Sequence, residues 1–128
     1  MALKRQVGLK QAFRYKGGGP MLVWMLHRIS GVGIALFVGI HILASFSSQL
    51  FGWNLAKFLN VMYESPAFQI VVFFCALFHA INGLRITVLD LFPRLITFQR
   101  EAIWLEWAVF LPLYGFAVYV IVSTGLKV

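Results

Sequence analysis

The sequence predicts an all-α membrane protein with three transmembrane helices that belong to a larger helix bundle. Of its 128 residues, 61% are hydrophobic and only 12% are charged, which is more apolar surface than so small a domain can bury in its own interior. The charged residues also gather in clusters that leave long uncharged stretches between them, as in proteins that span a bilayer. We therefore expect most of the apolar surface to face lipid or partner helices.

The first span is predicted over residues 21–46, after an N-terminal segment of residues 1–20. No charged residue occurs from Ile29 to Ala56, which is ample for the ~20 residues that a span requires. A basic start followed by apolar residues also resembles a secretory signal, but this run continues far beyond the ~7–15 residues of a signal core. We expect the segment to be retained as a helix.

The second and third spans are predicted over residues 66–90 and 105–126. Ser65 and Pro66 are typical of a helix start, with serine as cap and proline at the first helical position. Phe92-Pro93 is expected to break the chain after the second span, and Pro112 is a candidate kink in the third.

A short amphipathic helix is predicted between the first two spans, on the outer membrane surface. Its apolar residues recur at helical spacing: Leu55, Phe58, Leu59 and Met62.

The distribution of basic residues predicts a cytoplasmic N-terminus. The net charge is +7, which could suggest nucleic acid, but the basic residues flank apolar spans, so we expect no nucleic-acid partner. One side collects Lys4, Arg5, Lys10, Arg14, Lys16, Arg28, Arg85, Arg94 and Arg100, and the other has Lys57 and Lys127. The chain is therefore expected to be a multi-pass protein of a bacterial or archaeal cytoplasmic membrane.

All three histidines lie in or at the edge of predicted spans, where ionisable side chains are usually functional or paired. His27 and His41 fall on about one face of the first helix, and Gly31 leaves room beside that face for a bulky group. On the second helix, His79 shares a face with Cys75, Asn82, Gly83, Ile86 and Asp90, and this face carries nearly all the polar residues of the span. A buried histidine can form an interhelical hydrogen bond, relay protons or bind haem iron, and the pattern alone leaves these open.

Two charged residues near the inner interface also have two interpretations each. Arg28 is a snorkelling cation of the positive-inside set, or it binds a quinone carbonyl or a haem propionate. Asp90 forms an ion pair with Arg94 four residues on, or it shuttles protons to a quinone. Cys75 is interpreted as a packing residue, and Ser30 as a residue that bonds its own helix backbone.

The depth of the histidines bears on how many haems the chain could serve. His41 lies about 20 Å from the inner boundary, and His79 about 16 Å or 9 Å, depending on whether Asp90 or Arg85 marks that boundary. Two ligands of one iron must oppose each other at one depth. We favour separate haems, each completed by a histidine from another chain.

Two motifs carry a family resemblance. Leu26-His27-Arg28-Ile29-Ser30-Gly31 resembles the L-H-R-[IV]-[ST]-G signature of the cytochrome b556 subunit, or C subunit, of succinate dehydrogenase. The segment from His79 to Arg85, followed by Asp90, is similar to that family's H-x-x-x-G-[IL]-R-x(4)-D signature. The motif order and spacing, the number of spans and the chain length agree from Met21 to about Val128.

The resemblance implies an electron-transfer role rather than succinate chemistry within this chain. It implies that His79 ligates haem b, that Arg28 lines a quinone pocket with His27 nearby, and that Asp90 lies close. His41 is similar to the first-helix histidine of relatives with two haems, so the resemblance implies one haem b or two. Many relatives carry a ubiquinone-binding serine where this chain has Trp24, which indicates a reshaped pocket.

The resemblance also implies partners. A flavoprotein would oxidise succinate at FAD, a subunit with iron-sulfur clusters would pass electrons to quinone, and a second small membrane anchor would supply the opposing histidine. Two alternative functions stay open. One is an anchor of a quinol:fumarate reductase, and the other is a haem-free membrane scaffold or small transporter subunit.

Overall fold

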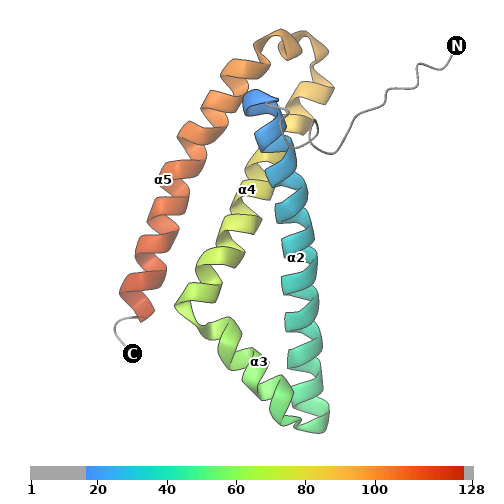
Figure 1. Ribbon diagram of the computed structural model, residues 1–128, viewed down its shortest axis with the longest axis vertical. Helices are drawn as coiled ribbons and strands as arrows, with labels where there is room; N and C mark the ends of the chain where they lie inside the picture. The colour runs from blue at the N-terminus through green and yellow to red at the C-terminus, as the bar shows by residue number, and fades with distance from the viewer. Residues whose placement is uncertain (1–16, 126–128) are drawn as a thin grey trace, which may run out of the picture.

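The computed structural model describes residues 17–125, and these residues are almost entirely helical (Figure 1). Three long helices cross the molecule: α2 (Gly18–Phe51), α4 (Pro66–Leu91) and α5 (Gln99–Gly125). The shorter elements are α3 (Asn54–Glu64) and the 3-10 helix η1 (Pro93–Phe98). The three long segments are each long and apolar enough to cross a membrane, which confirms the predicted all-α membrane architecture. The basic cluster from Lys4 to Lys16, and Lys127, lie outside the described residues.

Helix α2 is longer than its predicted span because backbone hydrogen bonding does not stop where hydrophobicity falls. It has 34 residues, or about 51 Å at 1.5 Å per residue, against a hydrocarbon core of about 30 Å. It ends at Gly52, whose φ of 62° lies in the left-handed region that glycine adopts without strain. The N–H of Gly52 donates to the Ser48 carbonyl at 3.2 Å.

Helix α3 confirms the expected short helix between the first two spans. Leu55 and Phe58 are 69% and 63% exposed, whereas Ala56 is buried. Two hydrogen bonds join α3 to α2. The Tyr63 hydroxyl donates to the Phe37 carbonyl at 2.8 Å, and the Ser45 hydroxyl donates to Asn60 Oδ1 at 3.3 Å.

Ser65 is the N-cap residue of α4 as predicted, but its side chain makes no capping hydrogen bond to that helix. Its hydroxyl donates instead to the Met62 carbonyl at 2.6 Å, at the end of α3. Only one residue separates the two helices, so the serine oxygen serves the last turn of the preceding helix. Pro66 does occupy the first turn of α4, as expected.

Helix α5 begins at Gln99, six residues before its predicted start. Phe92-Pro93 ends α4 as expected, but η1 then leads directly into α5, so the turn is helical throughout. Pro112 lies inside α5, which continues through it to Gly125.

Helix α4 is the central element, because it packs against both α2 and α5 (Figure 1). The buried core where the three helices meet contains Val23, Phe78, Ile103 and Phe110. Aromatic side chains of α4 and α5 surround this core, and the Tyr114 hydroxyl donates to the Ile70 carbonyl at 3.2 Å. Most other large apolar side chains are exposed, which leaves them for lipid or partner chains.

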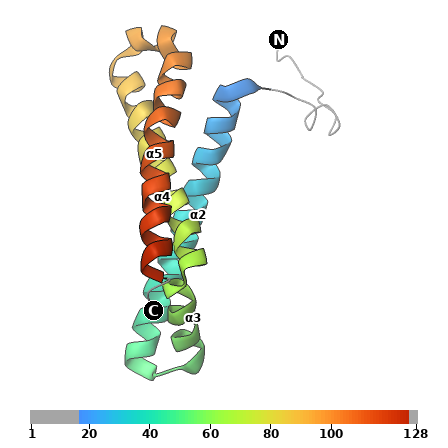
Figure 2. The ribbon, with the colours of Figure 1, turned by 90° about the vertical axis from the view of Figure 1, so that its left-hand side faces the viewer.

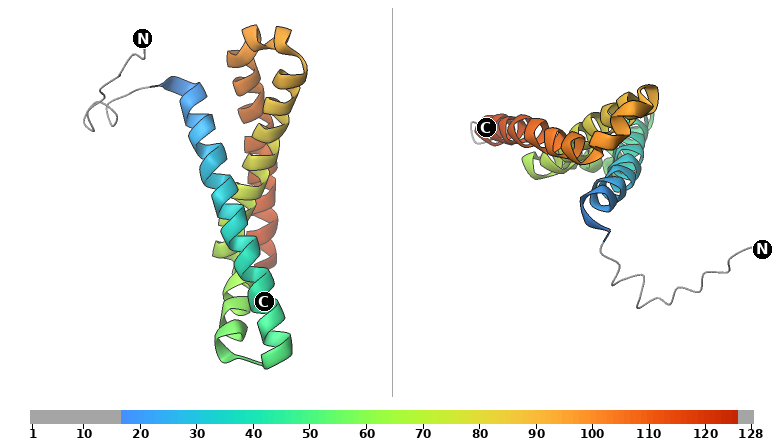
Figure 3. Two further views of the ribbon diagram at one scale, coloured as in Figure 1. Left: turned by 90° about the vertical axis from the view of Figure 1, so that its right-hand side faces the viewer. Right: turned by 90° about the horizontal axis from the view of Figure 1, so that it is seen from above.

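The N-terminal end of α2 diverges from α4 and α5 (Figure 2, and left panel of Figure 3). The same end of the molecule carries η1 and the start of α5 (Figure 1). The candidate site lies on this side of the molecule, because the polar residues of α2 and α4 meet where the two helices begin to separate.

Candidate haem and quinone site

Two histidines from different spans lie in direct contact. The imidazole rings of His27 on α2 and His79 on α4 are stacked, with centroids 4.0 Å apart and planes only 8° from parallel. Both side chains are half-buried. The structure therefore brings together the two histidines of the two sequence motifs.

Two glycines make this contact possible. A Cβ on Gly31 would lie 2.9 Å from Cε1 of His79, and a Cβ on Gly83 would lie 3.6 Å from Cε1 of His27. Each ring thus rests beside a glycine of the opposite helix. The room that Gly31 provides is occupied by His79 itself, rather than by a separate bulky group as the sequence suggested.

The hydrogen bonds of His79 define its tautomer. Nδ1 lies 3.1 Å from the backbone carbonyl of His27 and 3.4 Å from the Ser30 hydroxyl oxygen. A carbonyl oxygen can only accept, so the proton of the neutral imidazole is assigned to Nδ1, which donates to His27. Nε2 consequently carries the free lone pair. It forms no hydrogen bond within residues 17–125 and is not enclosed by them.

Ser30 supports this arrangement from a buried position. Its hydroxyl donates to the same His27 carbonyl at 2.9 Å, three residues back in the helix. This is the local backbone bond that the sequence favoured for Ser30. The His27 carbonyl therefore accepts hydrogen bonds from two side chains, that of Ser30 on its own helix and that of His79 on α4.

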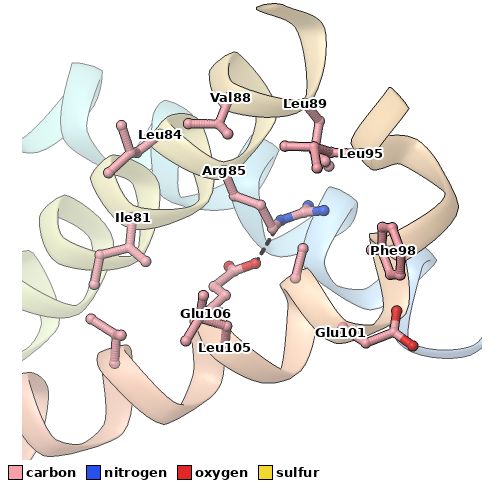
Figure 4. A pocket seen from close by; sticks show the side chains of 12 residues that line it. Ile81, Leu84, Arg85, Val88, Leu89, Leu95, Phe98, Glu101, Leu105 and Glu106 are labelled. Atoms are coloured by element: carbon pink, nitrogen blue, oxygen red, sulfur yellow. Dashed lines mark ion pairs between the residues drawn. The ribbon is translucent and has the colours of Figure 1, made fainter. Parts of the chain in front are cut away.

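A second group of polar residues, Asn82, Arg85 and Glu106, links all three spans, and Figure 4 shows its ion pair between Arg85 and Glu106. The guanidinium Nε and Nη2 of Arg85 donate to Asn82 Oδ1 at 3.1 and 2.7 Å, and Asn82 Nδ2 donates to the Val23 carbonyl at 3.4 Å. Arg85 Nε also lies 2.8 Å from Glu106 Oε2 on α5. Because the single Nε hydrogen is directed at Asn82, the contact with Glu106 is an ion pair without an aligned hydrogen bond.

Glu106 was assigned no role from the sequence, although it lies inside the predicted third span. It is 3% exposed, so its carboxylate is enclosed by protein. The sequence feature that could have indicated this ion pair is a carboxylate in the third span together with an arginine in the second. Sequence alone did not give the rotation of α5 that brings the two charges together.

A cavity of about 370 Å³ lies where α2 separates from α4. His27 and Trp24 line it from α2, and Arg85 and Asp90 line it from α4. Residues of η1 and the start of α5 close the remaining side. The cavity thus combines an imidazole, a guanidinium and a carboxylate with apolar walls.

Arg28 does not line this cavity within the isolated chain. Its guanidinium carbon lies 4.2 Å from the ring centroid of Trp24, one turn earlier on α2, and the side chain is exposed. Trp24 does line the cavity. The contact is a cation–π interaction that places Arg28 behind Trp24 and toward the outside of this chain.

Asp90 is exposed at the cavity edge and forms no ion pair with Arg94 in the described part of the chain. The helical four-residue spacing behind that alternative does not apply, because α4 ends at Leu91 and Arg94 belongs to η1. The ion-pair interpretation of Asp90 was therefore wrong.

His41 lies well away from the histidine pair. It is exposed on α2, ten residues beyond Gly31 or about 15 Å along the helix. Its ring centroid is 5.0 Å from that of Tyr63, and both side chains line a small cavity of about 200 Å³ between α2, α3 and α4. His41 and His79 therefore occupy different levels of the helix bundle.

Cys75 is a packing residue in the structure. It is buried on α4, and its Sγ would lie 3.0 Å from a Cβ at Gly33. Within residues 17–125, no three His, Cys, Asp or Glu side chains converge on a point that could hold a metal ion.

The fold and this site define a class: a multi-pass integral membrane protein with a paired histidine site between its first two spans. Residues 2–123 match the family of the succinate dehydrogenase/fumarate reductase transmembrane subunit, and the chain belongs to that family. It is also 32% identical over 101 residues to the Succinate dehydrogenase 2 membrane subunit SdhC of Mycobacterium tuberculosis. That match covers 76% of this chain and 73% of the relative. Family membership makes the chain part of an oxidoreductase complex with catalytic partner subunits.

Proposed function

We propose that this chain is the haem b-binding membrane anchor of a succinate dehydrogenase, in which electrons pass from an iron-sulfur subunit to membrane quinone. The observation that carries the proposal is the free Nε2 of His79. A histidine whose Nδ1 donates to a backbone carbonyl presents Nε2 to a metal in a fixed orientation, which is the arrangement typical of ligating histidines. The donor set therefore fits haem iron.

A b-type haem supplies one-electron exchange near the quinone, and the protein sets its potential through the ligand, hydrogen bonds and burial. His79 would hold the haem iron through Nε2 as one of its ligands. The second would come from a second small anchor subunit, because His27 is stacked against His79 rather than opposed to it. His27 is proposed to lie in the vicinity of the haem propionates.

The quinone head is proposed to bind in or beside the 370 Å³ cavity. Asp90 stands at its edge, where a carboxylate can exchange protons with water and with a reduced quinone. Arg28 faces outward on the same end of α2, so it would reach the quinone or a propionate at the contact with a partner subunit. The basic residues Arg28, Arg85, Arg94 and Arg100 at this end support its placement on the cytoplasmic side, where the flavoprotein with FAD and the iron-sulfur subunit would dock.

A second haem is proposed at His41, on the other side of the helix crossing. Its separation from His79 means that one iron cannot use both residues from this chain. Its exposed position next to Tyr63 leaves the imidazole available to a group held partly by the second anchor. The anchor of a quinol:fumarate reductase would use the same site in the reverse direction.

The test is a reduced-minus-oxidised optical spectrum of the purified complex, with the haem content measured per complex. We expect b-type bands in the wild type and loss of one haem in His79→Ala, with the complex still assembled. His41→Ala is the matched comparison, because it removes an imidazole from the other level. A wild-type complex without b-type bands would favour the haem-free scaffold and refute the proposal.

A further inference from the structure

Arg85 is held in place by Asn82 on its own helix and by Glu106 on α5, yet most of its hydrogen-bonding capacity is unused within residues 17–125. Only two of the five guanidinium N–H groups donate within the described residues, both to Asn82. Arg85 lines the 370 Å³ cavity together with His27 and Asp90. It also lines a larger apolar cavity of about 600 Å³ between α4, η1 and α5, where it meets Glu106. The guanidinium therefore forms part of the wall between the two cavities.

The burial of the Glu106 carboxylate at this position costs free energy. The side chain is almost completely buried, and within residues 17–125 neither Oε1 nor Oε2 has a hydrogen-bond partner. Burying an ion pair costs desolvation energy that the attraction alone often does not repay, so such pairs are weak evidence for stability. The presence of a buried carboxylate here is better explained by its effect on the position of the Arg85 guanidinium.

The contacts of Arg85 fix one edge of the guanidinium and leave the other free. Glu106 contacts Nε and Asn82 accepts the hydrogens of Nε and Nη2, so Nη1 forms no hydrogen bond with any residue that the structure describes. In Figure 4 the guanidinium of Arg85 extends past the ion pair and away from Glu106. A planar cation with one edge anchored presents its remaining donors in a fixed direction.

We propose that Glu106 is a positioning residue that holds Arg85 so that its free N–H groups bind an oxygen acceptor of the ligand in the 370 Å³ cavity. The shared chemistry is an oxygen with partial or full negative charge, carried by a quinone carbonyl or by a haem propionate. Arg85, rather than Arg28, is then the cation that this chain contributes to the cavity from within. This proposal rests on the proposed function and assigns its ligand contacts.

The experiment uses the assembled complex with two variants. Glu106→Gln keeps the shape of the side chain and removes the charge that holds Arg85. The double variant Arg85→Gln/Glu106→Gln removes both charges, so no buried charge is left unpaired and the fold is least disturbed. The measurements are KM and kcat for quinone, the haem midpoint potential, and the amount of assembled complex.

The two sources of the oxygen give different results. If the acceptor is the quinone carbonyl, KM for quinone rises about tenfold in both variants with kcat little changed, as expected for loss of one hydrogen bond from a charged donor. If the acceptor is a propionate, the haem midpoint potential falls in the double variant and shifts in Glu106→Gln, while KM stays unchanged.

Glu101→Gln is the matched control, because it removes the same charge from an exposed residue on the same helix. The Glu101→Gln complex should retain the wild-type KM for quinone and the wild-type haem midpoint potential. An assembled double variant with wild-type KM and potential would overturn the proposal. A change in the double variant without any change in Glu106→Gln would overturn the positioning role. Absence of haem and quinone reduction in the wild type would instead reject the proposed function.

Discussion

The imidazole rings of His27 and His79 lie parallel at a centroid distance of 4.0 Å, and the Nδ1 of His79 donates to the carbonyl of His27. One residue of α2 thus contacts His79 through its ring and its backbone. The other ring nitrogen of His79, Nε2, forms no hydrogen bond within residues 17–125. This relationship joins the two family motifs into a single site and leads to the predictions below.

Gly31→Ala should displace His79. The new Cβ would lie 2.9 Å from Cε1 of the imidazole, which is too close, so the ring or the helices must move at a cost of about 1–3 kcal/mol. We expect a lower haem content per complex and a lower melting temperature. Gly39→Ala is the control on the same helix, because its Cβ meets nothing within 4 Å. Equal haem content in the two variants would show that the Gly31 contact does not position His79.

Ser30→Ala should change the haem environment without removing the haem. The substitution deletes a hydroxyl that donates to the His27 carbonyl and lies 3.4 Å from His79 Nδ1. With one donor lost, the carbonyl accepts more strongly from Nδ1–H, which makes Nε2 a stronger electron donor and lowers the midpoint potential. A potentiometric titration of the optical bands measures this shift.

Ser123→Ala provides the comparison for Ser30. It removes an exposed hydroxyl that makes the same type of bond, to the carbonyl three residues back, on α5. The haem midpoint potential of the Ser123→Ala complex should equal that of the wild type. A Ser30→Ala complex with the same unshifted potential would contradict the proposed link from Ser30 to His79.

Tyr63→Phe should loosen α3 from α2. The hydroxyl donates to the Phe37 carbonyl at 2.8 Å, and loss of such a bond costs about 1 kcal/mol. Burial raises the pKa of Tyr63 above its usual value of 10.0, because it disfavours the phenolate. The hydrogen bond from the neutral Tyr63 phenol therefore stabilises the contact of α3 with α2 fully below pH 10, and this stabilisation is lost as the pH rises through the raised pKa.

Limited proteolysis of the α2–α3 connection measures this loosening as a function of pH. The wild type should become more sensitive above pH 10, whereas Tyr63→Phe should be more sensitive at neutral pH and lack the alkaline step associated with this phenol. Tyr119→Phe, at a side chain that is 69% exposed on α5, is the control. An identical alkaline step in Tyr63→Phe would contradict the assignment.

The sequence was sufficient for the three spans because uncharged runs and their length depend only on composition along the chain. It was also sufficient for the break at Phe92-Pro93, which is a local property of proline. It was insufficient to predict the first residue of α5 or the hydrogen-bond partner of the Ser65 hydroxyl, because the structure at helix ends depends on which nearby backbone groups lack partners. Gln99 continues a helical turn that η1 has already begun.

The site was predictable in part for a similar reason. Periodicity placed His79 on a polar face of the second helix, but the stacking on His27 depends on the crossing of two helices at Gly31 and Gly83. The pairing of Arg85 with Glu106 depends on the rotation of α5, which its nearly uniform apolar composition does not specify. The motif places Arg28 next to His27, but the sequence does not show that its guanidinium lies against Trp24 instead of lining the cavity.

The most direct test is a high-resolution cryo-electron microscopy map of the complete complex, examined at His79. The expected map has the iron of a porphyrin bonded to Nε2, with Nδ1 still within hydrogen-bonding distance of the His27 carbonyl. Iron bonded through Nδ1, or a well-resolved His79 without a porphyrin against it, would contradict the assignment of this histidine as the axial ligand.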